Sequence, residues 1–305
     1  MGHAAVDEKN IAELCIDAEK CIGCGLCTKV CPNDLLLKNE KNQICHREIT
    51  QFGWSGCWRC QHCMAVCPVG AISVLGKKPE EAPALADVNA SAQTVEALVS
   101  GRRSHRRYLK KNVEKEVIER ILKVLQNAPN GGNKCQVEYT LIDDVEQMDR
   151  LRQIVTERME ALARKGIYAN GFDEASYRDL KRVQRSVRPD MVFCGVPHLL
   201  IPHAPVGSGC WQQDTDIACG YFELLCNAHG LGTVMMSYCV DVLNLMPDIR
   251  AMLEIPKNHY YSIAVGFGYP EIRYARGTDK AEQLKLHIPH FPADERRDGE
   301  DAAKY

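Results

Sequence analysis

One cysteine pattern occurs twice near the start of this 305-residue chain and limits how that part can fold. Each copy has three cysteines at intervals of three residues, a fourth cysteine four residues later, and then a proline. The copies are Cys21, Cys24, Cys27 and Cys31 before Pro32, and Cys57, Cys60, Cys63 and Cys67 before Pro68. Three thiolates at such short intervals can surround one metal centre, whereas the fourth is held away from it. The repeat therefore predicts a small module built around bound metal.

This spacing, C-x₂-C-x₂-C-x₃-C-P, is the iron–sulfur ligand run of bacterial ferredoxins, in which the fourth cysteine binds the other of two clusters. A structural zinc site would use C-x₂-C pairs or mixtures of cysteine and histidine. A disulfide framework would need an oxidising compartment. We therefore predict two [4Fe–4S] clusters. One is held by Cys21, Cys24, Cys27 and Cys67, and the second by Cys57, Cys60, Cys63 and Cys31.

Composition limits the remaining classes of function. The other eight of the 16 cysteines lack metal-ligand spacing, which favours small buried side chains in a reducing cytoplasm. A net charge of −2 argues against a general nucleic-acid binder. Residues 1–10 have no apolar run, and the most apolar stretch, 191–206, is interrupted by glycine, prolines and histidines. We therefore expect a soluble cytoplasmic protein with no secretory signal, no membrane span and no nucleic-acid partner.

The chain is long enough for about two domains. We predict a two-cluster module at residues 12–76, a charged linker with two prolines at 77–90, and a second domain at 91–290. Within the module, the insert 33–56 is expected to form short strands around Ile44 and Ile49. Apolar periodicity predicts helices at 91–100, 114–127, 145–165, 173–187, 214–229 and 242–253, and strands at 137–142, 198–201 and 260–267. A tight loop is expected at 230–233.

The second domain lacks the common nucleotide-binding motifs. No G-x-G-x-x-G follows an expected strand and no G-x₄-G-K-[ST] occurs, so neither a Rossmann site nor a P-loop is supported. Instead, four arginines and Ser104 lie between residues 102 and 107. Such a group can neutralise a phosphate dianion through charge-assisted hydrogen bonds. A solvated basic turn and a nucleic-acid patch are the alternatives that the run alone leaves open.

Five short motifs between residues 95 and 280 occur in an order that resembles the nitroreductase family. Residues 102–108 are similar to its R-x-S-x-[RK]-x-[FY] opening, and 128–133 to its P-S-S-x-N loop. Residues 216–218 and 230–233 are similar to its D-x-A helix and G-L-G-[ST] loop. Residues 268–270, followed by Arg273 and Arg276, are similar to its closing G-Y-P…[KR] signature. With the cysteine module in front, the chain resembles the ferredoxin–nitroreductase fusions of anaerobic bacteria.

The resemblance implies an α+β fold with a mixed, mostly antiparallel sheet and surrounding helices, preceded by a small 2[4Fe–4S] ferredoxin-like domain. It also implies an intertwined homodimer with FMN at the subunit interface. Its FMN phosphate and ribityl end would be held by Arg102, Arg103, Ser104 and Arg106, with Arg273 and Arg276 closing from the C-terminal side. The ring would be approached from the partner subunit by Pro129, Asn130, Gly131 and Asn133. A backbone N–H from Met235, Met236 or Ser237 would face the reactive flavin nitrogen.

The loop that borders the substrate side departs from the family pattern. Cys135 stands where the family has glutamine, the Pro-Trp pair that usually follows is absent, and Asn130-Gly131 replaces paired serines. The substrate preference of other members therefore does not carry over. No side chain is singled out as a catalytic acid or base.

The predicted function is an oxidoreductase that passes electrons from the clusters to FMN and on to a small acceptor such as a nitroaromatic, a quinone or an activated alkene. Reduced ferredoxin is favoured as the donor, with NAD(P)H as the alternative. Three other functions remain open because function is decided by the site and not by the fold. They are a non-catalytic electron carrier or redox sensor, a related flavin chemistry such as reductive dehalogenation or flavin ring cleavage, and nucleic-acid binding.

Overall fold

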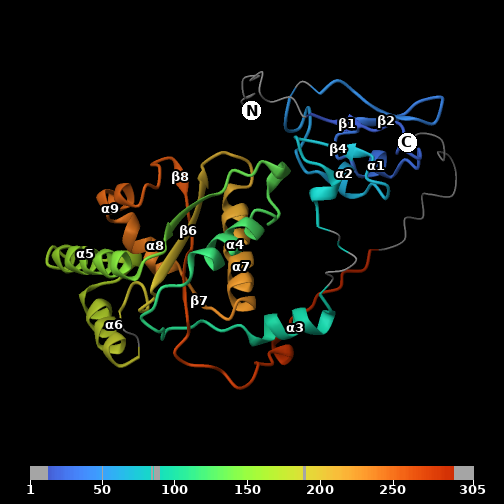
Figure 1. Cartoon of the computed structure of the whole chain (residues 1–305). Helices are drawn as coiled ribbons and strands as arrows, with labels where there is room; N and C mark the ends of the chain where they lie inside the picture. Colours follow the sequence, from blue (N-terminus) through green and yellow to red (C-terminus); the bar gives the residue numbers. More distant parts are fainter. Residues whose placement is uncertain (1–12, 50, 84, 86–89, 188–189, 292–305) are drawn as a thin grey trace.

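The computed structural model describes residues 13–49, 51–83, 85, 90–187 and 190–291, without the side chains of 183–187. Figure 1 shows a small N-terminal module, in blue, beside a larger domain with a central sheet. Among the described residues, no helix combines the length and the apolar character needed to cross a bilayer.

The small module consists of two short antiparallel ladders and two short helices. Strand β1 (Cys15–Ile16) pairs with β4 (Ile72–Ser73), and β2 (Leu36–Lys38) pairs with β3 (Ile44–His46). Helices α1 (Leu26–Val30) and α2 (His62–Ala65) follow equivalent positions of the cysteine repeat. Leu36, Met64 and Val74 are among the buried residues between them. The strand expected near Ile44 is present as β3, whereas Ile49 is buried outside any strand.

The larger domain is organised around one antiparallel sheet. Its strands are ordered β5 (Glu138–Ile142), β6 (His198–Pro205), β9 (Ala264–Gly268) and β7 (Gly232–Met236), and the short β8 (His259–Tyr260) also pairs with β6. Every strand pair described is antiparallel. The predicted α+β fold with a mostly antiparallel sheet is therefore confirmed.

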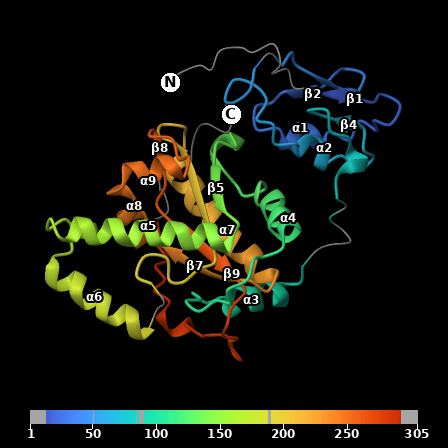
Figure 2. The same cartoon turned by 60° about the vertical axis from the view of Figure 1, so that its left-hand side comes forward.

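Helices cover both faces of the sheet. Alternate β6 residues point to opposite faces, as strand geometry requires: Leu199 and Ile201 join one buried cluster, and Leu200 joins the other. The first cluster includes residues of α5 (Val145–Ala163), α8 (Ser237–Asn244) and α9 (Pro247–Met252). The second includes residues of α4 (Lys115–Leu125) and α7 (Trp211–Ala228). Figure 2 shows α5 crossing one face while α7 lies on the other.

The remaining helical elements in the described part of the chain are α3, α6 and four 3₁₀ turns. Helix α3 (Ala92–Gly101) begins after Ser91, whose hydroxyl accepts a hydrogen bond from the Thr94 N–H, and it contacts α7. Helix α6 (Glu174–Val187) follows α5. Single 3₁₀ turns are present at η1 (Pro79–Glu81), η2 (Gly131–Asn133), η3 (Ala169–Gly171) and η4 (Ala281–Gln283).

Four sequence-based boundaries are wrong. Strand β6 runs through Pro202 to Pro205. On the side away from β5, it pairs with β9 up to Leu200 and with β8 from Ala204, and Pro202, which has no N–H to donate, lies between these two pairings. The helix expected at 242–253 is two helices, because Pro247 cannot continue α8 and instead starts α9. The strand expected at 260–267 is divided into β8 and β9, and residues 232–233 begin strand β7 and are not part of a loop.

Candidate functional site

Two cavities in the small module are each lined by four cysteines. One is bordered by Cys21, Cys24, Cys27 and Cys67. The other is bordered by Cys31, Cys57, Cys60 and Cys63. Three cysteines of each set come from one copy of the repeat and the fourth comes from the other copy. Four thiols around a largely apolar cavity are a donor set that fits a [4Fe–4S] cluster.

Backbone N–H groups point at the sulfur atoms of the two fourth cysteines. The N–H of Leu35 donates to Cys31 Sγ (3.3 Å), and the N–H of Ala71 donates to Cys67 Sγ (3.2 Å). The donor lies four residues after the cysteine in both copies. Hydrogen bonds to ligand sulfurs stabilise extra negative charge and so tune the reduction potential of a cluster.

The cysteine thiols are unfavourable places for negative charge without a metal. Burial, followed by the neighbouring Cys60, Cys57 and Cys31, raises the pKa of the Cys63 thiol to about 11. Burial likewise raises the pKa of the Cys27 and Cys57 thiols. Thiolate ligation in these cavities therefore requires the positive charge of iron.

In the larger domain, the arginine-rich segment lies along the edge of strand β7. Ser104 forms an isolated parallel bridge with Thr233, and the N–H of His105 donates to the carbonyl oxygen of Thr233 (2.8 Å). A Cβ atom on Gly232 would approach the His105 ring to 2.6 Å, so only glycine allows this close contact. The segment that carries the arginines is thereby fixed beside residues 232–233 at the start of strand β7.

Arg102 is held by a buried acid on helix α7. Its Nε lies 3.2 Å from Glu223 Oε2, and its Nη1 donates to Glu223 Oε1 (3.3 Å). Glu223 also accepts a hydrogen bond from the Thr233 hydroxyl (3.2 Å). A guanidinium has five N–H donors, so this arrangement orients Arg102 and leaves donors for an anionic ligand.

Arg103 connects the end of helix α3 to the C-terminal segment. Its Nη1 donates to the carbonyl oxygens of Ser100 (2.8 Å) and Arg102, and its Nη2 to that of Arg276 (3.3 Å). The structure therefore brings Arg276 to the arginine-rich segment. Arg106 is exposed, and its Nη1 donates to the Ser104 carbonyl oxygen (3.3 Å). Arg273 is exposed and makes no described hydrogen bond or ion pair with this group.

Met235 and Met236 end strand β7, and Ser237 starts helix α8. Both methionines pair with β9 on one side. On its other side, β7 has only the bridge from Ser104 to Thr233 among the described residues. Backbone beyond Thr233 on this edge is thus available to a ligand, while the methionine side chains differ: Met236 is buried and Met235 is partly exposed.

The loop at 129–133 is fixed at the opposite end of helix α7. The N–H of Gly131 donates to the buried carboxylate of Asp214 (2.9 Å), and a Cβ atom on Gly131 would lie 2.9 Å from Cys210 Sγ. Asn133 and Cys135 both have left-handed backbone angles (φ 50° and 51°), which are strained for residues other than glycine. The Asn130 side chain supports this shape by accepting from the Cys135 N–H (2.9 Å).

The two parts of the predicted flavin site are therefore held at separate points along helix α7. Glu223 and Asp214, which hold them, are nine residues apart on α7, and a helix rises about 1.5 Å per residue, so they are roughly 13–14 Å apart along its axis. Sequence reasoning missed both anchoring acids. Their signal was the presence of carboxylates within a helix rich in small and apolar residues, since such acids are rarely buried without partners.

One hydrogen bond connects the loop at 129–133 to the small module. The Asn133 side-chain amide donates to the carbonyl oxygen of Trp58 (2.8 Å). Trp58 follows Cys57 and lines the cavity bordered by Cys31, Cys57, Cys60 and Cys63. Its ring packs edge-on against Trp54, with ring centres 4.7 Å apart. The second predicted cluster thus lies on the side of the module that faces the loop at 129–133.

Comparison with known proteins identifies the family. The nitroreductase family model matches residues 99–269, more than half of the chain. The chain belongs to the nitroreductase family. A model of a 4Fe–4S dicluster domain matches residues 7–71 of this nitroreductase-family protein. These matches confirm the predicted fusion, the flavin-dependent oxidoreductase class and the presence of two [4Fe–4S] clusters.

Individual relatives cover the two parts separately. An uncharacterized ferredoxin of Methanocaldococcus jannaschii is 35% identical over 71 residues, which are 23% of this nitroreductase-family chain and 86% of the ferredoxin. Iodotyrosine deiodinase of Danio rerio is 24% identical over 182 residues, 57% of this chain and 59% of that protein. The chain therefore spans little more than half of the deiodinase.

Two solved nitroreductases share the fold of the larger domain. The FMN-bound enzyme of Bacteroides fragilis matches with a TM-score of 0.51 and 18% identity, over 65% of this chain and all of that one. The FMN-bound enzyme of Desulfitobacterium hafniense matches with a TM-score of 0.51 and 16% identity, over the same shares. At these identities the likeness shows the nitroreductase fold.

Proposed function

We propose that the protein is an FMN-dependent oxidoreductase in which the two [4Fe–4S] clusters supply electrons for the reduction of a small acceptor. FMN is the flavin bound by both solved nitroreductases described above. Clusters carry single electrons, whereas a flavin handles one or two, so the two modules together can convert single electrons into pairs. The modules are proposed to span residues 12–76 and 91–290, joined by a linker at 77–90.

The observation that supports this proposal most directly is the hydrogen bond from Asn133 to the Trp58 carbonyl oxygen. Asn133 belongs to the loop proposed to border FMN, and Trp58 follows Cys57, a proposed cluster ligand. A direct contact between these two loops favours the cluster of Cys57, Cys60, Cys63 and Cys31 as the one nearer the flavin. Electrons would enter at the other cluster.

A homodimer with FMN at its interface is part of the proposal. The phosphate end would be held by Arg102, Ser104, Arg106 and Arg276, with Arg103 positioning the segment and Arg273 as a further donor. Pro129, Asn130, Gly131 and Asn133 would come from the partner, and residues 235–237 would offer a backbone N–H. Within one chain, Asp214 and Glu223 hold these two groups at separate points along α7. The cluster of Cys57, Cys60, Cys63 and Cys31 would then lie nearest the flavin held mainly by the other subunit.

Nitroaromatics, quinones and activated alkenes are the proposed acceptors, with reduced ferredoxin as the donor and NAD(P)H as the alternative. The similarity to iodotyrosine deiodinase supports a second candidate, reductive removal of a halogen from an aromatic compound. Cys135 and Asn130 in the loop beside the proposed substrate side differ from the usual family residues, so a distinct acceptor is expected.

An anaerobic assay tests the proposal. Protein purified without oxygen should contain both iron and FMN, and reduced ferredoxin should sustain turnover of at least one nitroaromatic, quinone, alkene or haloaromatic acceptor. A Cys60→Ala variant should bind FMN but lose turnover with ferredoxin. Flavin that is never reoxidised by any of these acceptors would favour the electron-carrier alternative, and equal turnover by the Cys60→Ala variant would remove the clusters from the path.

A further inference from the structure

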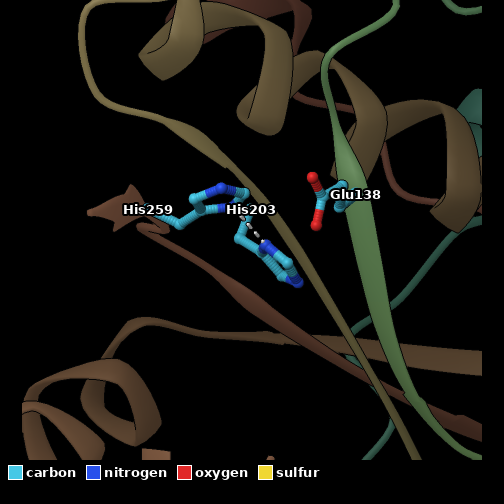
Figure 3. Close-up of side chains that lie close together, drawn as sticks. All are labelled: Glu138, His203 and His259. Carbon is cyan, nitrogen blue, oxygen red and sulfur yellow. Dashed lines mark hydrogen bonds between the residues drawn. The ribbon is translucent and has the colours of Figure 1, made fainter. Parts of the chain in front are cut away.

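Three side chains outside the cluster and flavin sites come together from three strands (Figure 3). Glu138 lies on β5 directly opposite His203 on β6, and His259 lies on β8, which pairs with β6 at the next residues. One carboxylate oxygen and one ring nitrogen from each histidine all lie within 4.8 Å of one another. Both imidazoles are buried, whereas Glu138 is exposed. The group thus combines a buried pair of nitrogens with a carboxylate that solvent reaches.

The hydrogen bonds around His203 determine which ring nitrogen carries its proton. The Thr140 hydroxyl donates its only hydrogen to the Leu253 carbonyl oxygen (3.0 Å), so its contact with His203 Nε2 (3.1 Å) must be one in which Thr140 accepts. His203 Nε2 therefore bears the hydrogen.

This tautomer leaves a lone pair on His203 Nδ1, directed at His259. The two Nδ1 atoms are 2.8 Å apart. In the absence of metal, His259 must donate the single hydrogen between them. A metal ion can take the place of that hydrogen, because it accepts a lone pair from each ring. Fixing the second ring nitrogen by a hydrogen bond to a hydroxyl, as Thr140 does here, is the arrangement that orients histidine ligands at metal sites.

We propose that Glu138, His203 and His259 bind a divalent transition-metal ion of the zinc type. Two histidines and one glutamate are a ligand set that zinc uses when a fourth position stays open. Zn–N bonds of about 2.0–2.1 Å place two nitrogens on a tetrahedral ion about 3.3 Å apart, so the rings must separate by roughly half an ångström.

The surrounding charges are compatible with a cation at this place. Glu138 brings a negative charge, and the two histidines are neutral ligands. Arg250 carries a positive charge that acts on His203. Its guanidinium donates hydrogen bonds to the carbonyl oxygens of Pro256 (2.6 Å) and His259 and packs over the Tyr261 ring. These bonds hold the backbone of β8 in place beside β6. A bound ion would join β5, β6 and β8 through their side chains.

Zinc binding by the anaerobic holoprotein tests this site. The holoprotein is used because empty cluster cysteines would also bind zinc. Zinc is added to full-length protein, unbound ion is removed by gel filtration, and zinc and iron are measured in the same sample. Wild type is compared with Glu138→Gln and His259→Ala, and with His287→Ala as a matched control, since His287 is exposed and outside the group. Crystals soaked in zinc are examined by anomalous diffraction at the zinc edge.

Wild type and His287→Ala should each retain one zinc per chain, with an anomalous peak between the three side chains. Glu138→Gln and His259→Ala should bind at least about tenfold more weakly while iron content is unchanged. No retained zinc in wild type, a peak elsewhere, or equal affinity in wild type and both variants would overturn the site. Because flavin reduction does not depend on these residues, none of these results bears on the proposed function.

Discussion

The guanidinium of Arg102 lies against the buried carboxylate of Glu223, with Nε and Oε2 3.2 Å apart. The pair joins the arginine-rich segment to helix α7, and the Thr233 hydroxyl extends it to strand β7. A charged residue oriented in this way before a ligand arrives needs less ordering when it binds an anion. This relationship makes Arg102 the best-positioned of the proposed phosphate ligands.

We therefore expect Arg102→Ala to weaken FMN binding. A lost hydrogen bond to a charged group costs about 1.5–3 kcal/mol, which corresponds to a dissociation constant raised by roughly 10- to 150-fold. Equilibrium titration of flavin-stripped protein with FMN, followed by flavin fluorescence, measures this change. Arg107→Ala is the matched control, because it removes a neighbouring arginine of the same run that is not a proposed ligand. Equal losses in both variants would mean that the run attracts FMN only through its overall charge.

The Asn133–Trp58 hydrogen bond predicts that the two modules protect each other. Replacing Asn133 by alanine removes the donor, and a net hydrogen bond contributes about 1 kcal/mol. We expect amide hydrogens of residues 57–60 to exchange several-fold faster in Asn133→Ala, and electron transfer to the flavin to slow by a similar factor. Hydrogen exchange with mass spectrometry measures the first effect. Unchanged exchange at 57–60 would show that the contact does not hold the modules together in solution.

The crosswise cysteine cavities predict which variants share a phenotype. Cys31→Ala should alter the same cluster signal in electron paramagnetic resonance as Cys60→Ala, because Cys31 and Cys60 line the same cavity. Cys67→Ala should instead match Cys24→Ala. If Cys31→Ala matched Cys24→Ala, each copy of the repeat would hold its own cluster and the assignment would be wrong.

The Tyr269 hydroxyl donates to the Glu114 carboxylate, and this bond, more than the nearby Lys111, lowers the pKa of Glu114 to about 2. The folded state thus favours the charged form. The stability that results is present above the ordinary glutamate pKa of about 4.3 and is lost as the pH falls through the lowered value. We expect Tyr269→Phe to raise the pKa of Glu114 more than Lys111→Met does, measured by carboxyl-carbon NMR. The reverse order would assign the shift to the lysine.

Local patterns in the sequence allowed much of the fold to be predicted. The cysteine spacing indicated two clusters, and apolar periodicity located most helices within a few residues, because both signals come from neighbouring positions. One error was local, because Pro247 lies inside the helix expected at 242–253 and divides it. Other errors arose where the structure depends on residues far apart in the sequence. Strand β6 continues through Pro202 because its partner strand changes there, and periodicity carries no record of pairing.

In the candidate site, too, local motifs predict some residues, whereas others depend on contacts between distant parts of the chain. A motif predicts Arg102 and Ser104 as site residues. Glu223 lies more than 80 residues from Arg102, and Asp214 more than 80 from Gly131, so these two acids are recognisable only once α7 is packed. The Asn133–Trp58 contact depends on how two modules lie against each other. The histidine pair at 203 and 259 likewise depends on the register of β6 and β8.

The central claim is that electrons reach the flavin through the clusters of this protein. Rapid anaerobic mixing with reduced ferredoxin, followed by the flavin absorbance, tests it in a single turnover. We predict fast flavin bleaching in wild type and strong slowing in Cys60→Ala, with FMN content unchanged. Bleaching at the same rate in both proteins, or wild-type protein that contains iron but binds no FMN, would contradict the account.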